Sequence, residues 1–179
     1  ITILTFLILG CSSTNAGFQR DADIIRLQHL KFYGELLEEY YKIKGKYPFQ
    51  GENSIPTYVY IANDEQIEST KPGPPYSHNV ISFKKFVDEV EFVLGKEIDE
   101  YYDPQYRPDK KPNFYMYLIN GDTYFFAINL HHPFPFTRKV GEDYYKAEIS
   151  NHPTPQNKAA LFQQLFNNPE IQAELNKQP

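Results

Sequence analysis

Apolar residues recur at spacings of three and four between residues 21 and 44. On a helix this spacing gathers them on one face, while the charged residues fall mostly elsewhere. The residues of this face are Leu27, Leu30, Tyr33, Leu37 and Tyr40. Gly45 supplies a C-cap, and Pro48 prevents continuation of the helix. The pattern therefore predicts a long helix over Asp21–Lys44.

Apolar runs further along the chain predict β-structure. Thr57–Ala62 and Tyr144–Ile149 are each typical of a short strand. The clearest local signal is Asn120-Gly121 between the runs Phe114–Ile119 and Thr123–Leu130, because this dipeptide supplies the positive φ angles of a type I′ hairpin turn. Both faces of this hairpin are apolar or aromatic, so we expect both to be covered, by helices or by a partner.

Two more segments have helical patterns. Ser82 is a suitable N-cap for a helix that runs to Leu94, and Gly95 closes it. Near the end of the chain a helix is predicted over Lys158–Phe166, which Pro169–Asn176 continues or restarts. We predict an α+β fold, in which a long N-terminal helix packs on an antiparallel sheet containing a central hairpin, with a C-terminal helix.

The first residues have the pattern of an export signal. The uncharged, mostly apolar run Ile1–Leu9 is too short for a membrane-spanning helix, which needs about 20 apolar residues, but it suits the apolar core of such a signal. Because neither methionine nor a basic segment precedes it, we interpret the printed sequence as lacking its first few residues. The alternative is that residues 1–10 form a buried strand or helix of the folded domain.

The end of this run, Ile8-Leu9-Gly10-Cys11, resembles the lipobox of bacterial lipoproteins. The resemblance implies cleavage before Cys11 and acylation of its thiol, so that the mature protein is anchored in a membrane of the cell envelope. Ser12 after the cysteine favours, by the same resemblance, the periplasmic face of the outer membrane. We accordingly divide the chain into a signal segment (1–10), a lipid-anchored tether (11–20) and one globular domain (21–179).

Composition restricts the partners of the chain. Of 179 residues, 41% are hydrophobic and 23% are charged, as in ordinary globular proteins. The net charge of −5 argues against nucleic acid and against an anionic membrane surface, but is compatible with a basic or neutral protein. The 15 Tyr and 14 Phe predict a core of large flat side chains and a surface on which tyrosine hydroxyls contact water.

No local signature of a hydrolase or a nucleotide-binding site occurs in the sequence. We therefore predict no catalytic residue, no metal and no cofactor, and lean towards a protein that is not an enzyme. His131 and His132 form the most suggestive polar pair. Neighbouring residues on a strand point to opposite faces, so at most one of the two could join a shared site, and a solvated strand end is the favoured interpretation.

Acidic residues and tyrosines are concentrated in the segment that follows the second predicted helix. A solvated acidic face is the default interpretation of this segment. The functional alternative is a surface for docking a basic protein, since charge speeds encounter and tyrosines supply rigid contact area. The candidate protein-binding residues are Asp99, Glu100, Tyr101, Tyr102, Asp103 and Tyr106.

A second resemblance concerns residues 21–50. The pattern Leu37-x-x-Tyr40-Tyr41-x-x-x-Gly45-Lys46-Tyr47-Pro48, at the end of a helix and before a loop and sheet, resembles the head region of type IV pilins and of type II secretion pseudopilins. The chain departs from that family at its start. Pilins keep an apolar N-terminal helix after a different cleavage, whereas this chain carries the lipobox-like sequence.

Three hypotheses about function follow. The leading one is a non-enzymatic, lipid-anchored envelope protein that binds another protein, most concretely an immunity lipoprotein that neutralises a toxin delivered by a secretion system. The second is a pseudopilin-like structural component of a secretion apparatus. The third is an envelope hydrolase that pairs a carboxylate, Asp103 or Glu100, with His131 or His132.

Overall fold

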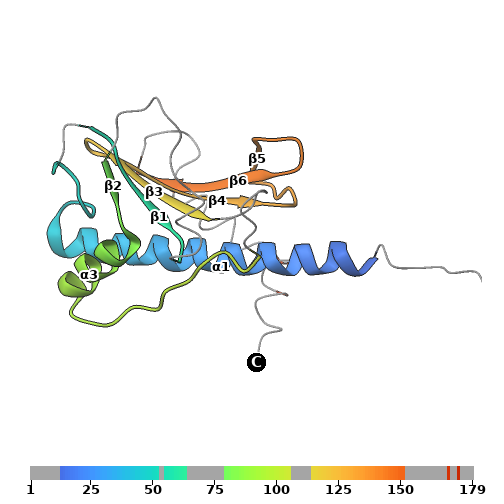
Figure 1. Ribbon diagram of the computed structural model, residues 1–179, viewed down its shortest axis with the longest axis horizontal. Coiled ribbons are helices and arrows are strands. Elements are labelled where there is room, and N and C mark those ends of the chain that lie inside the picture. Colours follow the sequence, from blue (N-terminus) through green and yellow to red (C-terminus); the bar gives the residue numbers. More distant parts are fainter. Residues whose placement is uncertain are drawn as a thin grey trace, which may run out of the picture.

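The computed structural model describes residues 13–52, 55–63, 79–105 and 114–151, together with Pro169 and Ala173. Within these ranges the chain forms two helices and one six-stranded sheet (Figure 1). The helices are α1 (Ser13–Lys44) and α3 (Phe83–Leu94). The strands are β1 (Thr57–Ile61), β2 (Asn79–Ile81), β3 (Tyr115–Asn120), β4 (Thr123–Leu130), β5 (Arg138–Lys139) and β6 (Tyr145–Ser150). The predicted α+β class is confirmed.

The sheet is mixed, and the expectation of a purely antiparallel sheet is wrong. Its strand order is β2-β1-β3-β4-β6-β5, and β1 pairs with β2 in parallel, Thr57 opposite Asn79. The remaining neighbours are antiparallel. A parallel pair needs a crossover of about a dozen residues or more, and the stretch between β1 and β2 is long enough to provide it. Because β2 is only three residues long, its sequence carries no clear strand pattern.

The structure tests the prediction for the first helix but describes little of the predicted C-terminal helices. α1 begins at Ser13, ahead of the predicted start at residue 21, and ends at Lys44. The predicted C-terminal helices lie outside the described residues, apart from Pro169 and Ala173, which are helical. Cys11 also lies outside them, as do residues 1–10. In the part of the chain that is described, no helix is long and apolar enough to span a membrane.

Local chemistry accounts for the main turns. Gly121 has a φ of 56° in the turn that joins β3 to β4, a backbone conformation that costs glycine little and other residues much more. The predicted type I′ turn at Asn120-Gly121 is wrong: Asn120 pairs with Thr123, and of the two turn residues, Gly121 and Asp122, only Gly121 has a positive φ. Ser82 caps α3, because its hydroxyl accepts a hydrogen bond from the Lys85 N–H. Gly95 ends the same helix with a φ of 66°. The first cap fixes where α3 begins, and the second fixes where it ends and the following loop starts.

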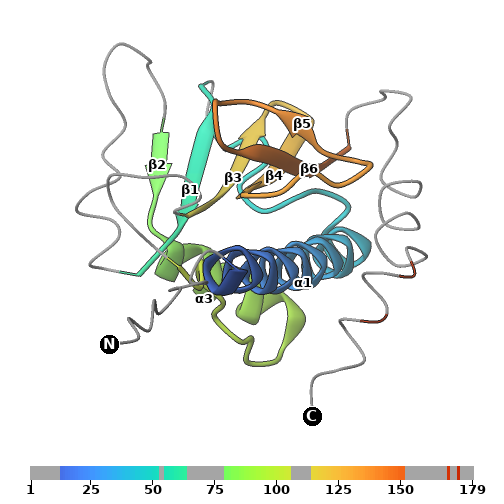
Figure 2. The ribbon, with the colours of Figure 1, turned by 90° about the vertical axis from the view of Figure 1, so that its right-hand side faces the viewer.

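α1 runs across one face of the sheet, and α3 lies beside the C-terminal half of α1 (Figures 1 and 2). The core lies between the helices and this face. Alternate strand residues point into it, as the two-residue period of a strand requires. The fully buried members on β1, β3 and β4 include Val59, Ile61, Tyr115, Tyr117, Tyr124, Phe126 and Ile128.

Tyrosine rings form much of this core. Tyr33 stacks on Phe126 with ring centroids 5.1 Å apart, and Tyr117 is fully buried with its hydroxyl donating to the carbonyl of Pro48. The hydroxyl of buried Tyr40 donates to Glu89. These buried rings belong to the predicted core of large flat side chains, and the hydroxyls of Tyr117 and Tyr40 bond to protein atoms. A buried hydroxyl with a partner avoids the desolvation cost, which lets large amphipathic rings fill the core.

Candidate functional site

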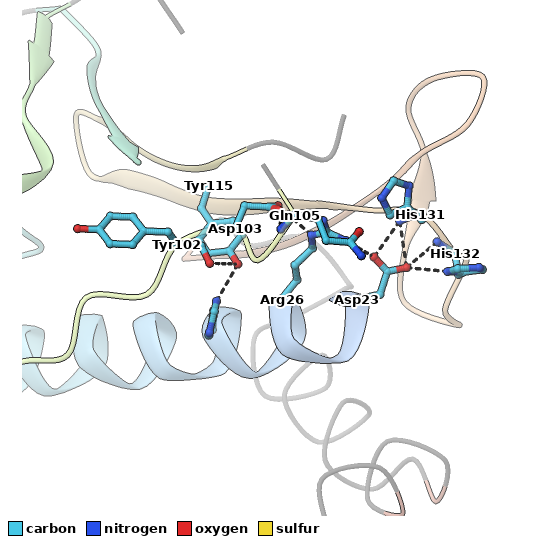
Figure 3. Close-up of polar contacts among 9 residues, drawn as sticks. Asp23, Arg26, Tyr102, Asp103, Gln105, Tyr115, His131 and His132 are labelled. Atoms are coloured by element: carbon cyan, nitrogen blue, oxygen red, sulfur yellow. Dashed lines mark hydrogen bonds and ion pairs between the residues drawn. The ribbon is translucent and has the colours of Figure 1, made fainter. Parts of the chain in front are cut away.

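Two carboxylates and one guanidinium form a buried charged network on the sheet-facing side of α1 (Figure 3). Arg26 Nε lies 2.8 Å from Asp103 Oδ2, and Nη2 lies 2.9 Å from Asp103 Oδ1, so the two groups form a bidentate pair. Arg26 Nη1 donates to Asp23 Oδ1 over 2.8 Å, one helical turn earlier. The side chains of all three residues are 0% exposed.

Within the network, the two carboxylates stabilise the buried positive charge of Arg26. Burial alone would lower the pKa of Arg26, but the hydrogen bonds and negative charges of Asp103 and Asp23 raise it above its ordinary value. The guanidinium therefore stays charged at every pH at which the fold exists. Removing any one member would leave an uncompensated buried charge, which is far more costly than an exposed one.

Asp23 connects α1 to the end of β4. Its carboxylate accepts hydrogen bonds from the backbone N–H groups of His131 and His132 at 2.8–3.0 Å. It also lies 2.9 Å from the Nδ1 atom of the His132 ring. One buried carboxylate thus holds the turn that follows β4 through three separate nitrogen atoms, as Figure 3 shows.

Asp103 connects the same helix to the loop that follows α3, residues 97–105, which we call the acidic loop. Besides its pair with Arg26, Asp103 accepts a hydrogen bond from the Gln105 N–H through Oδ1. Earlier in the loop, the Tyr33 hydroxyl donates to the carbonyl of Tyr101 and accepts from the Tyr101 N–H, both over 2.9 Å. Two side chains of α1 therefore fasten the base of the acidic loop at two points.

His29 fills the space between these two points. Its ring stacks on the ring of Tyr101 with centroids 4.7 Å apart and planes inclined by 10°. Its Nδ1 atom lies 2.7 Å from the hydroxyl of Tyr115 on β3, and that hydroxyl in turn donates to the carbonyl of Tyr102. Burial lowers the pKa of His29 to about 4. The ring is therefore neutral at pH 7.

The outer side of the acidic loop carries two tyrosine–carboxylate pairs. The Tyr101 hydroxyl donates to Asp99 Oδ2 over 3.1 Å, and the Tyr102 hydroxyl donates to Glu100 Oε2. Asp99 and Glu100 are exposed, whereas both tyrosines are half-buried. Burial raises the pKa of Tyr101, and the bond to Asp99 raises it further. The loop thus presents two carboxylates beside two aromatic rings whose hydroxyls they orient.

The structure divides the six candidate protein-binding residues. Asp99, Glu100, Tyr101 and Tyr102 lie together on the acidic loop. Asp103 is only 5% exposed and is bonded to Arg26, so its assignment to a docking surface is wrong. An arginine fork on a neighbouring element draws it into the core, which the local sequence does not reveal. Tyr106 lies outside the described residues, as does Cys11.

The histidine and carboxylate partners also differ from the hydrolase hypothesis. In the described ranges Asp103 is bonded to Arg26 and Gln105, and Glu100 to Tyr102. The acid that meets His132 is Asp23, on α1. No group of three or more metal-ligating side chains is found among the described residues. The predicted pairing of Asp103 or Glu100 with these histidines is therefore wrong, and the hydrolase hypothesis loses its acid–base pair.

The sequence contains a signal for the charged network that apolar periodicity alone misses. Leu37, Tyr33 and Leu30 step back along α1 by four and three residues, and the next two steps fall on Arg26 and Asp23. Both polar residues therefore continue the buried stripe of the helix. A polar residue at such a position requires a buried partner of opposite charge. Nothing local identifies Asp103 as that partner, because it is distant in sequence.

Comparisons with known proteins add no relative from which a role could be transferred. No family model matches this chain, and neither a curated protein nor a solved structure matches it.

Proposed function

We propose that this chain is a lipid-anchored protein of the bacterial cell envelope that binds another protein through its acidic loop, without catalysing a reaction. The lipid anchor is Cys11, and the binding residues are Asp99, Glu100, Tyr101 and Tyr102. The observation that carries the proposal is the way the acidic loop is held. Its base is fastened to α1 by Asp103 and by the backbone of Tyr101. Asp99 and Glu100 are exposed above this base, and the half-buried rings of Tyr101 and Tyr102 pack against the core.

Such a loop is preorganised for recognition. A flexible loop loses conformational entropy when it binds, at about 0.5–1.5 kcal/mol for each immobilised side chain. Here the two tyrosines already have hydroxyl partners, and the Tyr101 backbone already has Tyr33 as its partner. Most of that ordering cost has therefore been met during folding. Tyrosine rings with fixed orientation are effective contact residues for the same reason.

The charge of the loop indicates the chemistry of the partner. Asp99 and Glu100 are exposed neighbours, and the chain as a whole has a net charge of −5. Attraction between opposite charges accelerates encounter and excludes acidic partners. The partner therefore presents a basic surface. In the most concrete form of the proposal it is a toxin delivered into the envelope, and the chain is the immunity lipoprotein that neutralises it.

The test begins with recovery of the partner. A soluble Cys11→Ser form, incubated with envelope extract, is expected to retain one protein in stoichiometric amount. The double variant Asp99→Asn/Glu100→Gln keeps the shape of both side chains but removes their charge, and it should weaken binding about tenfold, which corresponds to 1.4 kcal/mol. Repeated recovery of no partner would contradict the proposal.

A matched control distinguishes the effect of the acidic loop on binding from the effect of the net charge of the protein. Glu142 and Asp143 are exposed neighbours in the turn between β5 and β6. The variant Glu142→Gln/Asp143→Asn therefore removes the same charge from another part of the surface and should bind the partner as the unsubstituted protein does. Equal weakening by both double variants would show that net charge, rather than the acidic loop, governs binding. For the immunity form, cells that express the chain should survive a toxin that kills cells without it.

The packing of α1 favours a second candidate, a pseudopilin-like component of a secretion apparatus. α1 lies across one face of the sheet, and its N-terminal turns project beyond the sheet in Figure 1. A projecting helix under a sheet is the arrangement that the resemblance over residues 21–50 implies. Deletion of the gene distinguishes the candidates. It stops secretion if the chain is part of the apparatus, and it leaves secretion intact if the chain only neutralises a toxin.

A further inference from the structure

His29 lies where α1, β3 and the acidic loop meet. The ring of Tyr101 covers one of its faces, and the Tyr115 hydroxyl contacts its Nδ1 atom at 2.7 Å. Because that hydroxyl donates to the Tyr102 carbonyl, its oxygen is available to accept the Nδ1–H of His29. The chain of bonds from His29 to Tyr115 to Tyr102 thus fits a neutral ring that carries its proton on Nδ1.

Burial outweighs the groups that favour a second proton on this ring. The charge of Asp103 and a hydrogen bond to the Tyr102 backbone raise the pKa of His29, and burial lowers it by more. On α1, the guanidinium of Arg26 lies one turn away and repels an imidazolium, and Tyr33 is neutral. On the acidic loop, Asp103 attracts the imidazolium, but both of its oxygens are already bonded to Arg26. Burial raises the pKa of Tyr101 on the acidic loop and raises that of Tyr115 on β3 well above its ordinary value, so both phenols are neutral.

We propose that His29 is an acid-sensitive latch for the acidic loop, so that protonation of its ring releases Tyr101 and Tyr102 from α1 and β3. The released loop keeps its charges but loses the fixed placement of its two tyrosines. This regulation rests on the proposed function, because it takes the acidic loop to be the binding surface. The opening of the loop itself is a property of the chain alone and is measured without any partner.

The direction of the effect follows from linkage. Burial lowers the pKa of His29 from 6.5 to about 4 when the loop is closed, and release of the loop returns it towards 6.5. Between these two values the open form binds more protons than the closed form. Acid therefore favours opening, and the closing equilibrium constant falls by about 20-fold between pH 7 and pH 5. Above pH 7 it is constant.

The experiment follows the Tyr101 amide, which donates to the Tyr33 hydroxyl and is protected only while the loop is closed. Hydrogen exchange of the full chain is measured from pH 7 to pH 5, and each rate is divided by the rate of an unstructured amide at the same pH. Protection of Tyr101 should fall about 20-fold. Amides of the β3–β4 pair serve as the internal reference and should keep their protection.

Two substitutions remove the titrating group in different ways. His29→Phe keeps a flat ring against Tyr101, and His29→Asn keeps an N–H donor near the position of Nδ1. In both, protection of Tyr101 should become independent of pH between 7 and 5. His131→Asn is the matched control, because His131 contributes only its backbone N–H to Asp23. That variant should retain the full pH dependence.

Three results would overturn the latch. Protection of Tyr101 could be the same at pH 7 and pH 5 in the unsubstituted chain, the pH dependence could persist in both His29 variants, or His131→Asn could abolish it. Each is independent of partner binding. If protection behaves as expected but no partner is recovered in the co-purification, the latch stands and the proposed function fails. If a partner binds equally well at pH 7 and pH 5 while the loop opens, regulation of binding by the latch is refuted.

Discussion

Replacing Arg26 by methionine tests whether the buried network holds the fold together. Met approximates the length of the arginine side chain and fills much of its volume without a charge. The substitution removes three hydrogen bonds, two to Asp103 and one to Asp23, and leaves two carboxylates inside the protein. Removing one partner of a buried ion pair costs about 3–5 kcal/mol. A domain of this size unfolds with a free energy of about 5–15 kcal/mol, so the loss is a large part of the total.

The two stranded carboxylates are not equivalent. Asp23 keeps its three nitrogen partners from His131 and His132, whereas Asp103 keeps only the Gln105 N–H among the described contacts. Most of the cost therefore comes from Asp103. The double variant Arg26→Met/Asp103→Asn removes that charge and should recover part of the lost stability, although each single substitution is destabilising. This non-additivity is the signature of a buried pair.

Urea unfolding at pH 7, followed by circular dichroism, measures these free energies. Lys31→Met is the control, because it removes a positive charge from the exposed pair of Lys31 with Glu35 on the same helix. An exposed pair contributes about 0–1 kcal/mol, so the control should remain close to the unsubstituted protein. The reasoning is refuted if Arg26→Met costs no more than Lys31→Met, or if Asp103→Asn adds its full single-variant cost to that of Arg26→Met.

Three further predictions use the same measurements. Tyr33→Phe removes both bonds to the Tyr101 backbone and should cost about 1–3 kcal/mol and expose the Tyr101 amide to exchange; an unchanged exchange rate would contradict this. Gly121→Ala forces a side chain into a positive φ and should cost about 1–2 kcal/mol in urea, which an equal midpoint would disprove. The pKa of His29 is about 4 in the folded state, below the unfolded value of 6.5, so the free energy of unfolding falls as the pH drops through this window. The expected loss is about 2 kcal/mol from pH 7 to pH 5, and the His29→Phe variant should not show it.

Local signals in the sequence are sufficient for the fold class but not for the complete sheet. Gly121 and Gly95 follow from turn and cap chemistry that acts within a few residues, and the structure has a positive φ at both. The parallel partner of β1 is different. β2 is paired across a long connection and its three residues include exposed Val80, so neither periodicity nor composition identifies it. Non-local pairing of short strands is decided by the packed structure.

The same limit applies to the site. Asp99 and Glu100 can be selected from sequence, because adjacent charges in a tyrosine-rich segment suggest a surface. Asp103 belongs to the same acidic, tyrosine-rich segment, yet it is buried. The reason is its ion pair with Arg26 on α1. Charge patterning alone does not separate an acid that faces solvent from one that anchors its loop. The burial of Arg26 on the apolar stripe of α1 is the missing information.

The use of charge at this junction explains why the acidic loop is held in one position. Apolar contacts are non-directional, so a loop fastened by leucines could settle in several places at similar energy. The Arg26 guanidinium donates to both oxygens of Asp103 in one geometry, and the Tyr33 hydroxyl donates to the Tyr101 carbonyl and accepts from the Tyr101 N–H. Buried polar groups add little net stability over a well-packed apolar core, but misplacing them is heavily penalised. At the base of the acidic loop, that penalty fixes the positions of its two tyrosines, Tyr101 and Tyr102, relative to its two exposed carboxylates.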